Sequence, residues 1–247
     1  MEPPYYFVTE KGRSKIFSTR TEYQSVQGVV SADQIERARP GESLQTHLGS
    51  QVRIYPADDI ELIESFSRGP QAITLKDALY IIGRCAITRD SLVVESGTGS
   101  ASMAAFLSLY AGAVISYERR EEFYKLSKKN LAQIADRPAF APIELVHAEF
   151  SEAQASRPAQ AVILDMPEPW TQFPTAHRLL ADTGSLACYT PNITQAIACT
   201  DALSEGFEHV ETVEIMRREW SAHGRIAKPK KELMHTAFLV FARVRKT

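Results

Sequence analysis

The sequence predicts an α/β protein in which a small β-rich domain precedes a mixed seven-stranded sheet with flanking helices. From about residue 85 onward, short apolar runs alternate with amphipathic helical stretches, which is typical of βαβ units on a parallel sheet. A glycine-containing turn, ESGTGSAS, separates the first of these runs from the first helical stretch. Residues 1 to about 55 instead carry short alternating runs and turn formers, which are typical of a small β domain.

The composition is that of an ordinary globular protein. The 247 residues are 44% hydrophobic, enough for a sizeable core, and no apolar run reaches the roughly 18 residues of a membrane span. The first ten residues, MEPPYYFVTE, lack the basic and apolar regions of a leader, so we expect a cytoplasmic protein without a membrane partner. The formal charge of −2 means that any contact with RNA must come from local basic patches. Three scattered cysteines predict neither a disulfide framework nor a metal site.

We expect three segments along the chain. These are the β-rich domain at residues 1–57, a linking segment at residues 58–84, and the α/β domain at residues 85–247. We expect a helix at the start of the linking segment, at residues 58–66. A polar, basic stretch separates the last two strands, so we expect the last strand to insert antiparallel. The expected strands of the α/β domain are residues 92–94, 114–117, 144–147, 161–164, 186–189, 210–215 and 237–242, and the expected helices are residues 103–110, 121–134, 173–180 and 193–204.

The turn ESGTGSAS is expected to bind a nucleotide-like cofactor. Gly97 and Gly99 let the chain bend sharply and let a ligand approach bare backbone at a helix N-terminus. The second strand ends at Glu118, about twenty residues beyond the glycines, where an acid can accept both ribose hydroxyls. The third strand ends near Glu149, within reach of an adenine amino group. Two acids at successive strand ends predict an adenosine-shaped slot.

NAD and S-adenosylmethionine are the two cofactors that this slot could take. NAD-binding turns have a third glycine that relieves crowding between helix and strand, and Ser102 stands at that position here. The turn instead follows the pattern E-x-G-x-G-x-G of methyltransferases, with Ala101 at its last glycine. A carboxylate at Glu95 could draw the cationic sulfonium side of the cofactor. We therefore favour S-adenosylmethionine.

The stretch LDMPEPW places Asp165 at the end of a buried strand. A strand-end aspartate stands at the carboxyl edge of the sheet, where α/β proteins place their ligands. Pro167 and Pro169 fix φ and remove backbone donors, which gives a stiff loop beside the carboxylate. Methyltransferases of exocyclic amines carry a contiguous D-P-P-W type of motif, and the spaced prolines here do not reproduce it. Asp165 is therefore the candidate catalytic residue.

The chain resembles the class I tRNA (adenine-N1)-methyltransferases, which act on T-loop adenine 58 and, in archaeal members, also on adenine 57. The resemblance rests on VVESGTGSAS, SYERREEF, LDMPEPW, YTPNITQ, RREW and HTAFLVFAR. It implies a Rossmann-like class I methyltransferase fold, in which residues 85–247 form the catalytic domain that binds S-adenosylmethionine. It also implies tRNA as the partner, a homotetramer, and N1-methylation at position 58, with position 57 left open.

The resemblance also implies roles for individual residues. Asp165 matches the family's catalytic aspartate, and Phe123 would lie along the adenine slot. The family's linker motif usually reads Y-P-K-D, and Thr74 stands here in place of its tyrosine. The expected cofactor-binding residues are Glu95, Gly97, Thr98, Gly99, Ser100, Ala101, Ser102, Met103, Glu118, Phe123, Ala148, Glu149 and Asp165.

Contacts with tRNA phosphates need basic side chains, because the nucleic-acid backbone is negatively charged. The candidate phosphate contacts are Arg217, Arg218, Lys228, Lys230 and Lys231.

Two alternatives to an active tRNA methyltransferase stay open: a catalytically impaired tRNA-binding partner subunit, and a methyltransferase for another substrate. The retained Asp165, Gly97, Gly99 and Glu118 argue against the first alternative. The second alternative leaves the motif PNITQ unexplained.

Overall fold

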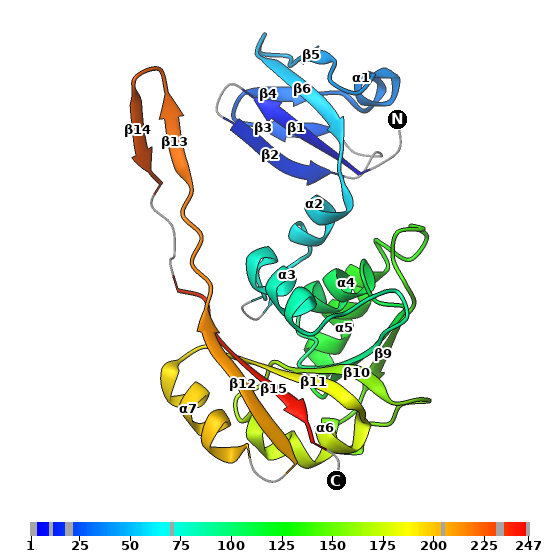
Figure 1. Cartoon of the computed structure of the whole chain (residues 1–247). Coiled ribbons are helices and arrows are strands. Elements are labelled where there is room, and N and C mark those ends of the chain that lie inside the picture. Colours follow the sequence, from blue (N-terminus) through cyan, green and yellow to red (C-terminus); the bar gives the residue numbers. More distant parts are fainter. Residues whose placement is uncertain are drawn as a thin grey trace. The chain divides into compact units, whose positions relative to one another are not determined.

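The chain forms two compact units, Met1–Phe66 and Ser67–Thr247, each described here by itself (Figure 1). The computed structural model describes residues 4–9, 12–17, 22–69, 72–203, 206–230 and 235–245. Within these ranges, no helix is long and apolar enough to cross a membrane. The expected linking segment is divided between the units, because α2 (Asp59–Glu64) belongs to the first and α3 (Leu75–Arg84) to the second.

The N-terminal unit is β-rich, as predicted. Its four-stranded sheet has the order β2-β1-β6-β5, and β3 and β4 form a separate two-stranded sheet. Phe7 and Tyr23 stack in its core with their ring centroids 4.2 Å apart, and both are buried. The elements are β1 (Tyr5–Thr9), β2 (Gly12–Phe17), β3 (Tyr23–Ser25), β4 (Gly28–Val30), α1 (Ala32–Arg37), β5 (Ser43–Gln45) and β6 (Gln51–Pro56).

The C-terminal unit is built on a mixed seven-stranded sheet with the order β12-β15-β11-β10-β7-β8-β9. The strands from β11 through β10, β7 and β8 to β9 run parallel, whereas β15 is antiparallel to both β11 and β12. The predicted mixed sheet with an antiparallel last strand is therefore confirmed. The strands are β7 (Leu92–Ser96), β8 (Ala113–Glu118), β9 (Ile143–His147), β10 (Ala159–Leu164), β11 (Leu180–Thr190), β12 (Phe207–Glu214) and β15 (Phe238–Val244).

Helices cover both faces of this sheet, with α3, α4 and α5 on one side and α6 and α7 on the other (Figure 1). This cover explains why residues 161–164 of β10 are completely buried, since a central parallel strand has a helix layer on each face. Its last four residues are accordingly all apolar, without the alternation of a half-exposed strand. The helices are α4 (Ser102–Ser108), α5 (Glu121–Leu131), α6 (Phe173–Leu179) and α7 (Ile193–Ala202), and two short 3-10 helices are η1 (Phe150–Glu152) and η2 (Pro169–Gln172).

Two elements differ from the sequence-based expectation. Residues 75–84 form the amphipathic helix α3, which buries Ala78, Ile81 and Ile82, whereas we expected only a connection there. The basic stretch before the last strand contains a hairpin of β13 (Trp220–His223) and β14 (Ile226–Pro229), joined at Gly224 with a φ of +58°. Every residue of β14 is exposed, so the hairpin has no apolar periodicity by which the sequence could reveal it.

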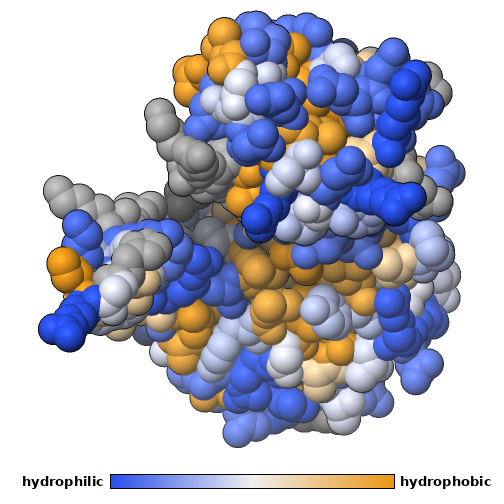
Figure 2. Space-filling view, turned by 90° about the horizontal axis from the view of Figure 1, so that it is seen from above, coloured by the Kyte–Doolittle hydropathy of each residue, from blue (hydrophilic) through white to orange (hydrophobic). Residues whose placement is uncertain are grey.

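The hairpin extends as an arm at the left of Figure 1 and is mainly hydrophilic in Figure 2, with a few hydrophobic residues among the polar ones. In the same hairpin, the large side chains of Trp220 and Ile226 are 53% and 70% exposed.

Candidate active site

The glycine turn lies directly against the start of the LDMPEPW loop. The Asp165 amide donates a hydrogen bond to the Ser96 carbonyl over 2.9 Å. Gly97 has a φ of +91°, and a Cβ atom added there would lie 1.8 Å from the Asp165 carbonyl oxygen. Only glycine fits this position, because any side chain would displace the backbone of Asp165.

Ala101 is the last residue of the turn and has a left-handed backbone, with a φ of +64°. This conformation costs an L-amino acid with a Cβ roughly 1–2 kcal/mol, which explains why glycine is usual at this position of the methyltransferase pattern. Ala101 is completely buried and does not line the cavity described next, so its expected contact with a cofactor is indirect.

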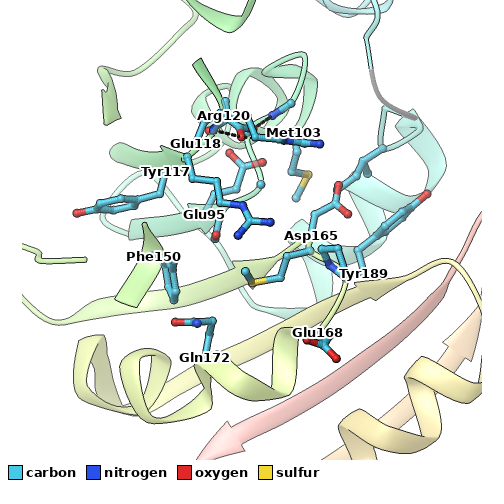
Figure 3. A pocket seen from close by; sticks show the side chains of 18 of the residues that line it. Glu95, Met103, Tyr117, Glu118, Arg120, Phe150, Asp165, Glu168, Gln172 and Tyr189 are labelled. Carbon is cyan, nitrogen blue, oxygen red and sulfur yellow. Dashed lines mark hydrogen bonds and ion pairs between the residues drawn. The ribbon is translucent and has the colours of Figure 1, made fainter. Parts of the chain in front are cut away.

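A cavity of about 440 Å³ opens at the carboxyl ends of β7, β8, β9, β10 and β11. Its volume and its mixture of polar and apolar walls are typical of a small-molecule site. Figure 3 shows Glu95, Glu118 and Asp165 around the same hollow. Eleven of the residues expected to bind the cofactor line it: Glu95, Gly97, Thr98, Gly99, Ser100, Ser102, Met103, Glu118, Ala148, Glu149 and Asp165.

Glu95 is a buried carboxyl with one free oxygen. The Ser116 hydroxyl donates to its Oε2 over 2.7 Å, whereas its Oε1 is buried and has no hydrogen-bond partner among the described residues. Burial raises the pKa of Glu95 to about 8, and the nearby Asp165 and Glu118 carboxylates act in the same direction against the Ser116 hydrogen bond. The free oxygen is suited to a cationic or hydrogen-bond-donating ligand group.

Glu118 fixes the glycine turn from the neighbouring strand end. Its Oε2 accepts a hydrogen bond from the Gly99 amide over 3.0 Å, and its Oε1 accepts from the Arg120 amide over 2.9 Å. The Arg120 guanidinium lies 3.9 Å from the centroid of the Phe123 ring and 3.3 Å from Glu118. Phe123 therefore packs against Arg120 and is not among the residues that line the cavity, and its expected place along the adenine slot stays a prediction.

Asp165 stands at the end of β10 and lines the cavity. Burial raises the pKa of its carboxyl to about 7, and Glu118 adds to this effect whereas Arg120 opposes it. The following loop is held by Gln195, whose side-chain amide donates to the Pro167 carbonyl over 2.8 Å. Trp170 packs against the hydrophobic core of the sheet and does not line the cavity. The carboxyl of Asp165 is thus placed by backbone contacts on both sides of it.

Glu149 lies at the rim of the cavity. Its side chain is 54% exposed and forms an ion pair with Arg119 over 3.6 Å. Because exposed ion pairs are weak, Glu149 can exchange this partner for a ligand at little cost.

Three polar side chains of the cavity were missed by the sequence analysis. These are Tyr189, whose buried hydroxyl lies beside Thr236, and Gln172 and Gln195, whose buried Oε1 atoms make no hydrogen bond to any described residue. Burial, together with nearby carboxylates, raises the pKa of Tyr189 further above its ordinary value. Leu164 pairs with Cys188 on β10 and β11, so the next residues, Asp165 and Tyr189, lie near the same edge of the sheet. In the sequence, Tyr189 and Gln195 are marked only as the two ends of the motif YTPNITQ.

Residues 74–77, which match the linker motif, take part in a hydrogen-bond network at the start of α3. Buried Asp77 accepts hydrogen bonds from Thr74 and Thr236, each over 2.8 Å, and pairs with Lys76 over 2.7 Å. Asp77 therefore joins the start of α3 to the segment before β15, and none of the residues of this motif lines the cavity.

None of the expected phosphate contacts that the structure describes lines the cavity. Arg217 pairs with Glu219 over 3.1 Å, and Lys230 at the end of the hairpin pairs with the same carboxylate. Arg218 and Lys228 are exposed. Lys231 lies outside the described residues. In the part of the chain that the structure describes, no group of three or more acidic, histidine or cysteine side chains could hold a metal ion.

A family described as the tRNA methyltransferase complex GCD14 subunit matches residues 65–226. The chain belongs to this family. Its curated relatives include the tRNA (adenine(57)-N(1)/adenine(58)-N(1))-methyltransferase TrmI of Methanocaldococcus jannaschii, with 26% identity over 96% of this chain and 93% of the relative. The tRNA (adenine(58)-N(1))-methyltransferase TrmI of Thermus thermophilus is 29% identical over 87% of this chain and 86% of the relative.

Solved structures agree with the GCD14 assignment. The tRNA (m1A58) methyltransferase TrmI from Aquifex aeolicus superposes with a TM-score of 0.86 and 26% identity, covering 99% of this chain and 98% of that one. A SAM-dependent O-methyltransferase from Thermotoga maritima has a TM-score of 0.90 at 23% identity, over 99% of this chain and 93% of that one, which shows the shared fold alone. The predicted Rossmann-like class I methyltransferase fold is therefore confirmed.

Proposed function

We propose that the chain is an S-adenosylmethionine-dependent methyltransferase that methylates N1 of adenine 58 in the tRNA T-loop. The relatives that extend over nearly all of the chain are named for this reaction. The position of Asp165 carries the proposal on the side of the structure. Its backbone lies against Gly97 and Ser96, so its carboxyl stands beside the turn that would hold the methyl donor. This arrangement favours an active enzyme over a catalytically impaired partner subunit.

The cavity fits S-adenosylmethionine in its donor set. When bound, the cofactor supplies a methyl group that is activated toward nucleophiles. Glu95 offers a free buried oxygen to its cationic side, and Glu118 stands where an acid would meet the ribose. Glu149 lies at the rim, where it can meet the adenine amino group. The bare backbone at Gly97 and Gly99 would let the cofactor lie close to the turn.

Asp165 would act on the base. Adenine N1 already carries a lone pair, and gaining a methyl group leaves positive charge on the purine. An ionised carboxylate that faces N1 and the exocyclic amine accepts a hydrogen bond from the amine and stabilises that charge. Because burial raises the pKa of Asp165 to about 7, the active form of the free enzyme increases as the pH rises through 7.

The tRNA backbone would be contacted by the basic residues of the arm and of the segment before it. Arg218 and Lys228 are exposed, and Arg217 and Lys230 would exchange their ion pairs with Glu219 for phosphates. We add Lys231 to these proposed phosphate contacts because it follows Lys230 directly in the sequence. Replacing Lys228 and Lys230 with alanine should weaken tRNA binding. The slope of the logarithm of the binding constant against the logarithm of the salt concentration should fall by the equivalent of about two phosphate contacts. An unchanged salt dependence would place the phosphate contacts elsewhere.

Two expectations concern assembly and location. We expect a homotetramer, which sedimentation of the purified protein at several concentrations would reveal. We place the enzyme in the cytoplasm, because tRNA is its proposed substrate.

The test is transfer of labelled methyl groups to unmodified tRNA, followed by nucleoside analysis. The wild type should give N1-methyladenosine, and Asp165→Ala should lose it while remaining folded. Exposed Asp136 lies outside the cavity, so Asp136→Asn is the matched control and should keep the activity. If the wild type bound the cofactor but formed no N1-methyladenosine, the proposed function would be wrong.

A further inference from the structure

We propose that Gln195 reads the exocyclic amine of the target base through its side-chain oxygen. The inference rests on the proposed function and names a residue that would set its specificity. Gln195 lines the cavity together with Asp165, although it lies on α7 rather than at a strand end.

The backbone of Gln195 is fixed in the first turn of α7. The Asn192 side chain caps this helix, because its Oδ1 accepts a hydrogen bond from the Gln195 amide over 3.0 Å. The Thr194 hydroxyl donates to the same Oδ1 over 2.6 Å. The side chain of Gln195 therefore extends from a capped helix start, which limits its freedom.

The orientation of the Gln195 amide group follows from its partner. A backbone carbonyl can only accept a hydrogen bond, so the group that faces the Pro167 carbonyl at 2.8 Å must be the nitrogen, Nε2. The oxygen, Oε1, then points away from Pro167. It is buried and makes no hydrogen bond to any described residue. A buried acceptor without a donor is unfavourable, so this oxygen is suited to a donor brought by a ligand.

The chemistry of the neighbouring groups identifies that donor. Pro167 follows Asp165 by two residues, so Gln195 is bonded to the same loop that carries the carboxylate. A carboxylate and an amide oxygen together can accept two hydrogens, and the 6-amino group of adenine offers two. A 6-oxo purine would instead present an oxygen to both acceptors and be repelled. The pair thus selects an aminopurine and turns its amine edge, with N1 beside it, toward Asp165.

The test compares two T-loop RNAs that differ only at the target base, which is adenine in one and unsubstituted purine in the other. The readout is the ratio of kcat/KM for the two RNAs. Gln195→Met should lower the wild-type preference for adenine by roughly five- to tenfold, the effect of one lost hydrogen bond. Gln195→Glu keeps an acceptor oxygen but removes the donor to Pro167, and it should retain the preference. Exposed Gln133 lies outside the cavity, so Gln133→Met is the matched control.

Each outcome decides the matter. An unchanged ratio in Gln195→Met would overturn the inference, and so would an equal fall in both Gln195 variants, because the loop contact alone would then explain it. Calorimetry should give Gln195→Met a cofactor affinity within twofold of the wild type, and a larger loss would reassign the residue to the cofactor. If the wild type methylated neither RNA, the proposed function would fail and the inference with it. If the wild type methylates the RNA and Gln195→Met leaves the ratio of kcat/KM unchanged, the inference is wrong but the proposed function still stands.

Discussion

Replacing Glu95 by glutamine should stabilise the protein at alkaline pH and weaken its binding of a cationic cofactor. Glu95 is 1% exposed, and among the described residues its carboxyl receives a hydrogen bond from Ser116 alone, so an ionised carboxylate there is poorly compensated. Glutamine has nearly the same shape and stays neutral at every pH. The substitution therefore removes the cost of the buried charge while it keeps an acceptor for Ser116.

The magnitude follows from the pKa of Glu95, which burial raises from 4.5 to about 8. The unfolded chain loses this proton as the pH passes 4.5, whereas the folded chain holds it until about pH 8, so the folded state becomes less stable as the pH rises between these values. At about 1.4 kcal/mol per pH unit, the change from pH 5.5 to pH 8 is up to roughly 3 kcal/mol. Glu95→Gln should gain this amount relative to the wild type over the same interval.

Urea unfolding of both proteins at pH 5.5 and pH 8 measures this difference. The same change at exposed Glu122 is the matched control. An effect of Glu95→Gln that is equal at pH 5.5 and pH 8 would refute the reasoning, because the pKa of Glu95 would then be the same in the folded and unfolded states. In calorimetry, the variant should bind S-adenosylmethionine more weakly than the wild type does. The substitution should weaken the binding of the demethylated product less, because the sulfur of that product carries no charge.

Three further predictions concern the same unit. Gly97→Ala should cost roughly 3 kcal/mol or more in urea unfolding, because its Cβ would lie 1.8 Å from the Asp165 carbonyl oxygen; a cost under about 1 kcal/mol would contradict this close approach. Asp77→Ala should cost about 3 kcal/mol in the same assay, because it leaves Lys76 and two hydroxyl groups without their buried partner; a neutral effect would show that the network is dispensable. The affinity for S-adenosylmethionine should rise between pH 6 and pH 8.5 as Glu95 and Asp165 ionise, and calorimetry in buffers of different ionisation enthalpy should detect proton release, whose absence would contradict the raised pKa values.

The sheet could be predicted because its strands lie under two layers of helices. Residues such as 161–164 are apolar throughout, and most of the apolar runs are separated by helical stretches, so the sequence predicts the βαβ pattern. Gly97, Glu118 and Asp165 could be found for the same reason, since parallel strands bring their carboxyl ends to one edge.

The rest depended on contacts that no local pattern encodes. The β13–β14 hairpin is exposed, so neither burial nor alternation marks its strands. Gln195 reaches the cavity from a helix, through a hydrogen bond to Pro167 that is distant in sequence. The contact of Phe123 with Arg120 and the complete burial of Ala101 also depend on the fold, and the expected contacts of both residues with the cofactor stay predictions.

The most direct test of the account is to map the methyl group on a full-length tRNA transcript. After reaction with the wild type and S-adenosylmethionine, the masses of nuclease fragments should show one added methyl group at adenine 58, and nucleoside chromatography against standards should identify it as N1-methyladenosine. A second group at adenine 57 would add the activity named for the archaeal relative. The appearance of N6-methyladenosine would contradict the account. So would methylation of a transcript in which uridine replaces adenine 58, if the methyl group is then found at a position other than adenine 57.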